Sequence, residues 1–285
     1  METIELSSWT EFETRLNEIR SKYGTRESKS YDITQPTTKN DILYRGQSDS
    51  ALTLQTTLER FSQQEWTLKS YLALLLRCVH QIETFTGNKW NLDRDKIFEE
   101  LEREFDELFK IPTPSYEFWT YLRHLGFPSP LLDWTYSPYI ALFFAFAKQD
   151  SAKRAIGKAS VYAYIETPSG VKSDSSHKPK MAVKGPYVTT HKRHYFQQSL
   201  YTIAAEAIVG KNDYKFVCHE DVFKAYGERK KDQDVCIKIN IPRNKRIEVL
   251  EYLDAFNINH FSLIQSEESL IRSLAFKEIE RKTIE

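Results

Sequence analysis

Three polar side chains interrupt an otherwise apolar stretch at residues 122–146, namely Asp133, Trp134 and Thr135. A buried carboxylate needs a cation or a hydrogen-bond donor beside it, because an unpaired charge is costly to remove from water. The Ser137-Pro138 pair that follows is typical of a helix start. We therefore predict a turn between a strand and a buried helix that lines an anion-binding cleft. Alternatively, Asp133 caps local backbone N–H groups and Trp134 fills the core.

A second candidate site is the sequence Tyr44-Arg45-Gly46-Gln47, at the end of a predicted strand. Side chains alternate along a strand, and this alternation places Arg45 on an interior face. A buried arginine there is costly unless it meets an anionic ligand or a carboxylate. Gly46 permits a ligand to approach the backbone closely. A buried structural ion pair between Arg45 and Asp133 is the alternative, and such a pair could also hold the arginine ready for a ligand.

A basic cluster, His191-Lys192-Arg193-His194, forms the third group and precedes Gln197 and Gln198 at the head of another predicted strand. Such a cluster is either a solvated surface or a phosphate contact. Its two histidines have weak metal-binding spacing and no third ligand, so we predict no metal. His124 is either a base or hydrogen-bond donor at the site or a structural histidine.

The elements that must position these residues alternate between helical and strand patterns. A helical block, strongly charged and with apolar residues every three to four positions, separates the first two groups. The order of elements indicates an α+β fold, with residues 1–40 as an N-terminal helix and connector and residues 41–285 as the main domain. The predicted segments are helices at 7–23, about 59–112, 115–125 and 243–256, strands at 41–47, 159–166, 196–207 and 234–242, and connectors at 24–40 and 167–185.

Composition narrows the class of protein. The chain has 285 residues, with 40 basic residues that balance 40 acidic ones, which argues against a polybasic nucleic-acid binder. Its three cysteines lie far apart, which indicates neither a disulfide framework nor a zinc site. Because the sequence has no signal-peptide pattern and no apolar run long enough to cross a bilayer, we expect a cytoplasmic protein without membrane contact.

The three groups, taken in order, resemble the FRG family, which is named for a Phe/Tyr-Arg-Gly motif. Tyr44-Arg45-Gly46-Gln47 corresponds to that motif, and residues 124–145 correspond to the family's block around Leu-Asp-Trp-Thr. The third block corresponds to His194, Gln197, Gln198, Tyr201 and Thr202. One departure is Ser129-Pro130, where Thr-Arg is commoner in the family, so the role of that second arginine is absent here.

The FRG family is found in bacteria and phages and is often linked to defence, and its arginine strand is similar to the first strand of arginine-type ADP-ribosyltransferases. This similarity implies a mixed or antiparallel split sheet with an inserted helical block, and NAD as the substrate. The residues implied to bind NAD are Tyr44, Arg45, Gly46, Gln47, Asp133, Trp134, Thr135, His194, Gln197 and Tyr201. The residues implied to be catalytic are Arg45, Gln198, Glu206 and His124.

The implied roles follow those enzymes. Arg45 holds the pyrophosphate, Trp134 or Tyr201 stacks on the nicotinamide, and Gln198 or Glu206 orients the ribose. Those enzymes use a glutamate where this strand offers glutamines, and a glutamine cannot act as a general base.

Three functions therefore stay open. The first is an NAD-dependent ADP-ribosyltransferase-like toxin or phage-defence effector, which modifies a macromolecular target or is held by an antitoxin or immunity partner. The second is a non-catalytic module that binds a nucleotide or a nucleic acid. The third is a metal-dependent nuclease that uses Asp133, His124 and His194. The helical block either recognises the target or covers the core.

Overall fold

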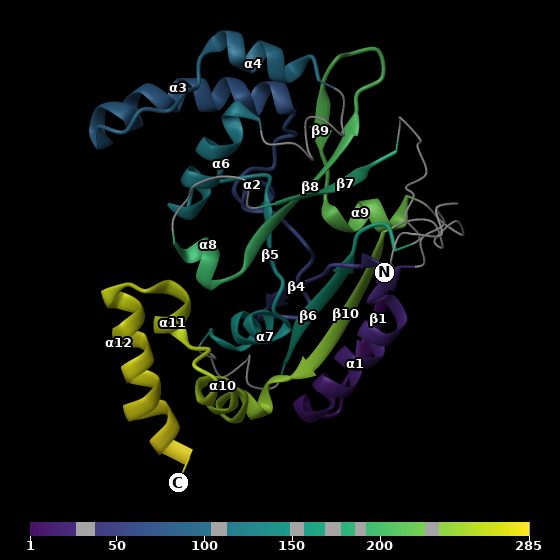
Figure 1. Ribbon diagram of the computed structural model, residues 1–285, viewed down its shortest axis with the longest axis vertical. Helices are drawn as coiled ribbons and strands as arrows, with labels where there is room; N and C mark the ends of the chain where they lie inside the picture. The colour runs from purple at the N-terminus through teal and green to yellow at the C-terminus, as the bar shows by residue number, and fades with distance from the viewer. Residues whose placement is uncertain are drawn as a thin grey trace.

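The computed structural model describes residues 1–26, 38–103, 113–148, 157–168, 178–185, 192–225 and 234–284. Within them, the chain forms an eight-stranded mixed sheet with helices packed on it (Figure 1). The strand order is β1-β10-β6-β4-β5-β8-β7, with β9 paired to β8, and every pair except the parallel β1–β10 pair is antiparallel. The predicted α+β class is confirmed.

The strands of the main sheet are β1 (Glu2–Glu5), β4 (Ile42–Gln47), β5 (Leu132–Thr135), β6 (Lys158–Ile165), β7 (Lys180–Lys184), β8 (Ser199–Ala207), β9 (Tyr214–Phe216) and β10 (Val235–Pro242). Two short strands, β2 (Thr25–Arg26) and β3 (Thr38–Lys39), pair with each other. The helices are α1 (Phe12–Tyr23), α2 (Thr57–Phe61), α3 (Leu68–Thr86), α4 (Arg94–Leu101), α6 (Pro114–His124), α7 (Pro138–Phe146), α8 (Arg193–Phe196), α9 (His219–Lys224), α10 (Arg246–Ala255), α11 (His260–Ile264) and α12 (Glu267–Ala275).

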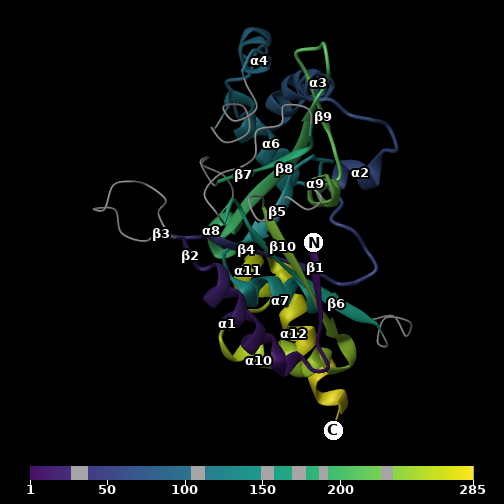
Figure 2. The same cartoon turned by 90° about the vertical axis from the view of Figure 1, so that its right-hand side faces the viewer.

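Two groups of helices lie at opposite ends of the sheet (Figure 2). In the first half of the molecule, α1, α7 and α10 pack on the strands β1, β10, β6 and β4 around one apolar core. In the second half, α3, α4 and α6 pack on β7 and β8 around another core. A third cluster lies on the other side of the sheet, between the strands and α9. Each half therefore buries an apolar core of its own.

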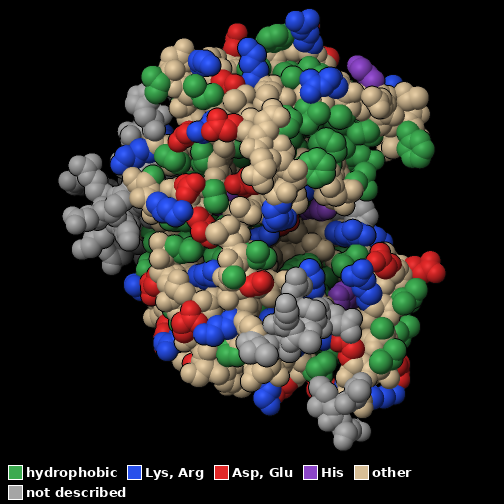
Figure 3. All heavy atoms as spheres, turned by 180° about the vertical axis from the view of Figure 1, so that it is seen from behind, with side chains coloured by type: hydrophobic (Ala, Val, Ile, Leu, Met, Phe, Trp, Pro, Cys, Tyr) green, Lys and Arg blue, Asp and Glu red, His purple; other side chains and the backbone are tan. Residues whose placement is uncertain are grey.

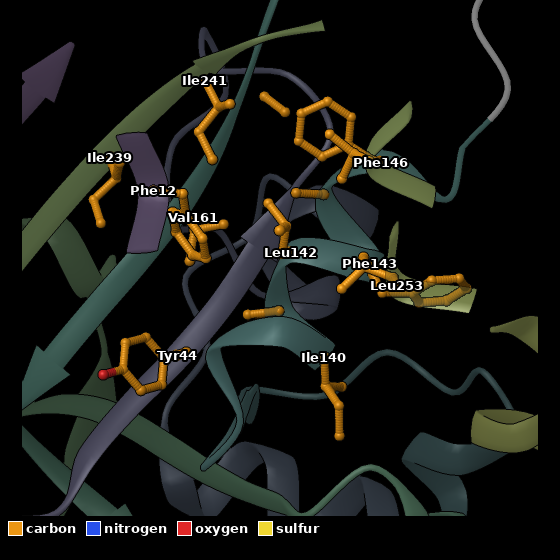
Figure 4. Close-up of a cluster of buried hydrophobic side chains, with 14 of the residues drawn as sticks. Phe12, Tyr44, Ile140, Leu142, Phe143, Phe146, Val161, Ile239, Ile241 and Leu253 are labelled. Carbon is orange, nitrogen blue, oxygen red and sulfur yellow. The ribbon is translucent and has the colours of Figure 1, made fainter. Parts of the chain in front are cut away.

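Helix α7 is the buried helix that the Ser-Pro pair predicts. The hydroxyl of Ser137 accepts a hydrogen bond from the backbone N–H of Ile140, and Pro138 opens the first turn. The helix is apolar on nearly every side because it lies between the sheet and α10, as the side chains in Figure 4 show.

Several predicted segments differ from the structure. Asp133, Trp134 and Thr135 belong to strand β5 itself, and the turn before α7 begins one residue later. The predicted connector at residues 167–185 ends in strand β7, while its residues 169–177 lie outside the described residues. Strand β1 was not predicted, because four residues with two charges carry little strand signal.

The predicted helical block is observed as α2, α3 and α4, and its residues 104–112 lie outside the described part of the chain, as do residues 27–37 of the first connector. The division of the chain near residue 40 stays a prediction, although β1 joins the N-terminal segment to the main sheet. Of the helices described, none has the length and apolar character that crossing a bilayer requires.

Candidate functional site

The candidate site is a pocket that opens where strands β4 and β5 separate. In the described strands, Tyr44 of β4 is bridged to Thr135 of β5 and no further pair joins these two strands. By contrast, β4 pairs with β6 as far as Gln47, and β5 pairs with β8 along its whole length. The resulting pocket has a volume of about 640 Å³, which is in the range of small-molecule sites. Figure 3 shows a hollow between the two halves with Lys, Arg and His side chains around it.

Arg45 reaches this pocket from β4. Its Nη1 donates a hydrogen bond of 2.8 Å to the backbone carbonyl of Asp133, and its side chain is 17% exposed. Its Nε is buried and has no hydrogen-bond partner in the described part of the chain. Burial lowers the pKa of Arg45 to about 10, so the guanidinium remains charged at neutral pH. A buried charged group with unused donors is the strongest indication of an anionic ligand in this molecule.

The carboxylate of Asp133 is held mainly by Arg123, the next-to-last residue of α6. Arg123 Nε donates to Asp133 Oδ1 at 2.6 Å, and its Nη2 donates to Oδ2. Arg45 Nη1 lies 3.9 Å from the same Oδ2. Burial alone would raise the pKa of Asp133, but the charge and hydrogen bonds of Arg123 outweigh it and lower that pKa. Asp133 is therefore an ionised carboxylate, and its side chain is still 49% exposed.

The rest of the lining makes the pocket basic. Arg60, Lys148 and Arg272 line it together with His260, whereas Asp133 is the only carboxylate among the described lining residues. Arg60 Nη1 donates a hydrogen bond of 2.7 Å to the backbone carbonyl of Gln55. This bond holds the guanidinium of Arg60 at the wall of the pocket. An excess of cations in a concave site attracts anions.

The other residues of the two motifs have structural contacts. The side chain of Trp134 is 2% exposed, and its Nε1 donates to the hydroxyl of Thr202 at 2.7 Å. The hydroxyl of Thr135 accepts from the backbone N–H of Ser137. Tyr44 is buried in the core beside α7 (Figure 4). The side chain of Trp134 therefore fills the core, as the alternative for this residue predicts, while Tyr44, Trp134 and Thr135 all also line the pocket.

Gly46 permits a close approach, but that of helix α7. A Cβ atom at this position would lie 1.9 Å from the carbonyl oxygen of Ala141 and 2.6 Å from the backbone nitrogen of Ala145. The absence of a side chain therefore lets α7 pack directly on β4. Gln47, the next residue, lines the pocket, and its Nε2 lies 3.4 Å from the carbonyl oxygen of Thr53.

The histidines of the second and third blocks meet at one tyrosine. The hydroxyl of Tyr201 lies 2.6 Å from His194 Nε2 and 3.2 Å from His124 Nε2. Burial raises the pKa of Tyr201, so its phenol is neutral. Arg123 lies over the Tyr201 ring at 5.8 Å, so this cluster supports the arginine that holds Asp133. His191 lies outside the described residues.

Neither of the residues proposed to orient the ribose lines the pocket, although both chain neighbours of Gln198 do. Gln198 is exposed, has a left-handed backbone with φ of 47°, and is not among the lining residues. Glu206 lies seven residues beyond Ser199 on β8, roughly 23 Å along the strand, and forms an ion pair of 3.0 Å with Lys215. Gln197 does line the pocket, where its Nε2 donates to the carbonyl of Leu263.

A contact between α8 and α11 closes one side of the pocket. Besides the bond from Gln197, Arg193 Nε donates to the carbonyl of Ile264 at 3.2 Å. Both carbonyls belong to the last turn of α11, where backbone acceptors lack partners within the helix. We call these two hydrogen bonds the α8–α11 clasp, and it links the two halves across the pocket.

Sequence reasoning missed Arg123 and the three rim cations Arg60, Lys148 and Arg272. Arg60 and Arg272 lie in amphipathic helices, and Lys148 follows α7, where charged residues are ordinary. Arg123 precedes His124 in the sequence, but nothing in its spacing from Asp133 indicates a pair. In the described residues, no group of three potential metal ligands lies together.

The fold and the pocket together describe an α+β protein with a basic pocket at a gap between two strands of its sheet. Residues 40–154 match the model of the FRG domain, as the first two sequence motifs predicted. The match includes the first two sequence blocks and ends before the third. Neither a curated protein nor a solved structure matches the chain.

Proposed function

We propose that this protein is an NAD-consuming ADP-ribosyltransferase-like enzyme whose substrate binds between Arg45 and Asp133. The observation that carries the proposal is the pairing of two groups at one pocket. A buried guanidinium with an unused donor lies next to an ionised carboxylate that is still half exposed.

The arginine supports recognition of the pyrophosphate. A guanidinium offers donors in a planar fork that fits two phosphate oxygens, which the point charge of a lysine does not. The rim cations Arg60, Lys148 and Arg272 add to the attraction for a ligand with two negative charges. A pocket of about 640 Å³ accepts the reacting half of a dinucleotide.

The carboxylate supplies the chemistry. The bond between the nicotinamide nitrogen and the ribose carbon breaks, and its electron pair leaves with nicotinamide. The carboxylate of Asp133 stabilises the positive charge that develops on the ribose. A nucleophile of the acceptor then forms the new bond to that carbon and releases one proton. Asp133 takes this role because it lines the pocket, whereas Gln198 and Glu206 do not.

The finer assignments belong to the same proposal. They are an ADP-ribosyltransferase-like type of split sheet, a macromolecular acceptor, and a role as a toxin or defence effector with an antitoxin or immunity partner. The helical block of α2, α3 and α4 is the part that contacts the acceptor. Its α3 ends in a highly exposed phenylalanine, Phe85, which supports this assignment.

Incubation with labelled NAD and cell lysate tests the proposal. We expect transfer of label or release of nicotinamide by the wild type, and a loss of at least about a hundredfold in Asp133→Asn, as for removal of a group that stabilises transition-state charge. Asp133→Asn should still bind NAD in calorimetry. A wild type that neither binds NAD nor releases nicotinamide would contradict the proposal.

The second candidate is a nucleotide-binding module without turnover. One observation favours it, since the only carboxylate that lines the described pocket is already neutralised by Arg123. This candidate predicts binding of ADP-ribose that weakens steeply with salt, with no nicotinamide release from NAD. For the metal-dependent nuclease alternative, the described residues contain no group of three side chains that could bind a metal ion.

A further inference from the structure

Two arginines approach Asp133, and they contact different atoms of it. Arg123 contacts both carboxylate oxygens, whereas Arg45 donates to the backbone carbonyl and lies 3.9 Å from Oδ2. Arg45 therefore takes up little of the carboxylate's hydrogen-bonding capacity.

Arg123 is fixed in place on several sides. Its side chain is 8% exposed, and its Nη1 donates to the hydroxyl of Thr57 at 3.2 Å. That hydroxyl also accepts from the backbone N–H of Ser129 at 2.9 Å. The ring of Tyr201 lies beneath the guanidinium. An arginine held by this many contacts keeps its two-pronged geometry at little further cost in entropy.

Removal of Arg123 would leave an ionised carboxylate a short rotation from Arg45. Two opposite charges at that distance attract strongly in a partly buried site. The carboxylate would then occupy the donors of Arg45 and repel an incoming phosphate. An anionic ligand would have to displace it before binding.

We propose that Arg123 is a positioning residue that holds the carboxylate of Asp133 away from Arg45, so that the guanidinium of Arg45 stays available for the ligand's phosphates. This inference rests on the proposed binding of a phosphate-bearing ligand at Arg45. Arg123 itself does not line the pocket and acts through Asp133.

A double-mutant cycle tests the inference, with ADP-ribose as the probe in calorimetry. Arg123→Gln should bind ADP-ribose at least about tenfold more weakly than the wild type, the equivalent of one hydrogen bond to a charged group. The same Arg123→Gln change in an Asp133→Asn background should have no effect, because no carboxylate remains to capture Arg45. Arg123→Lys, which keeps the charge, should lie in between. Equal losses in both backgrounds would mean that Arg123 is only structural and would overturn the inference.

A second measurement needs no ligand and separates this inference from the proposed function. Phenylglyoxal modifies free guanidinium groups, and peptide mass spectrometry gives the rate at Arg45. We expect slower modification of Arg45 in Arg123→Gln and recovery in the double variant. If ADP-ribose does not bind but these rates follow the expected order, the proposed function fails and the positioning role stands. Absence of modification in the folded wild type, or a rate unaffected by Arg123→Gln, refutes the positioning role. Melting curves check that each variant is folded.

Discussion

The replacement of Arg45 by lysine is the most direct test of the pocket. Arg45→Lys keeps a positive charge but loses the planar fork of donors, including the buried Nε that has no partner in the described structure. We expect nucleotide binding to weaken by about 1–3 kcal/mol, which is about 5- to 150-fold in affinity.

The effect of Arg45 on folding stability follows from its contacts. Arg45→Ala removes one hydrogen bond from a charged donor, worth about 1.5–3 kcal/mol, but also removes a buried donor left unsatisfied at a cost of about 1–3 kcal/mol. These terms nearly cancel, so we expect a net change within about 1 kcal/mol. A buried structural pair of Arg45 with Asp133 would instead predict a loss of about 3–5 kcal/mol.

Arg123→Ala should be the more destabilising change, because Arg123 contacts both oxygens of Asp133. We expect a loss of about 1–3 kcal/mol, which is smaller than for a fully buried pair because the side chain of Asp133 is 49% exposed. Urea denaturation gives the free energies of unfolding, and calorimetry with NAD gives the affinities. Arg15→Lys, on the exposed face of α1, is the matched control. An affinity of Arg45→Lys equal to that of the wild type would refute the role of the guanidinium fork.

Three further outcomes are expected. Gly46→Ala should lower the free energy of unfolding by more than about 3 kcal/mol, because its Cβ would lie 1.9 Å from the carbonyl oxygen of Ala141, and urea denaturation measures this loss. Glu206→Gln should still release nicotinamide from NAD, whereas Asp133→Asn should not. An equal loss of nicotinamide release in both variants would show that Glu206 takes part in the reaction. Burial lowers the pKa of His219 to about 3. Because its unfolded value is higher, stability should fall as pH drops from about 6.5 toward 3, by up to about 1.4 kcal/mol per pH unit, and His219→Leu should flatten this slope in urea titrations.

The local elements were predictable because their signals lie within a few residues. The Ser-Pro pair and the apolar run that follows give the position of α7, and the alternation in β4 places Arg45 and Tyr44 on opposite faces. The proximity of Arg45 and Asp133 also follows from the sequence argument that a buried carboxylate needs a partner.

The identity of that partner was not predictable. Arg123 meets Asp133 because α6 docks with its C-terminal turn against β5, and this docking is decided by apolar contacts of α6 with α3, α4 and β8. The role of Gly46 was hidden for a similar reason. A glycine beside an arginine fits a ligand or a helix equally well until the position of α7 is known.

The single bridged pair between β4 and β5 has a mechanical consequence. Along most of that boundary the sheet lacks the ladder of hydrogen bonds that elsewhere transmits force from strand to strand. The two halves are joined there by one bridged pair, by Arg45 on the carbonyl of Asp133, by the α8–α11 clasp, and by the third apolar cluster, in which Trp134 of β5 packs on Tyr164 of β6. The proposed ligand, held by Arg45 on one side and Asp133 on the other, would act as a non-covalent cross-link between the two strands. We therefore expect occupancy of the pocket to stiffen the boundary between β4 and β5, where backbone pairing is sparse.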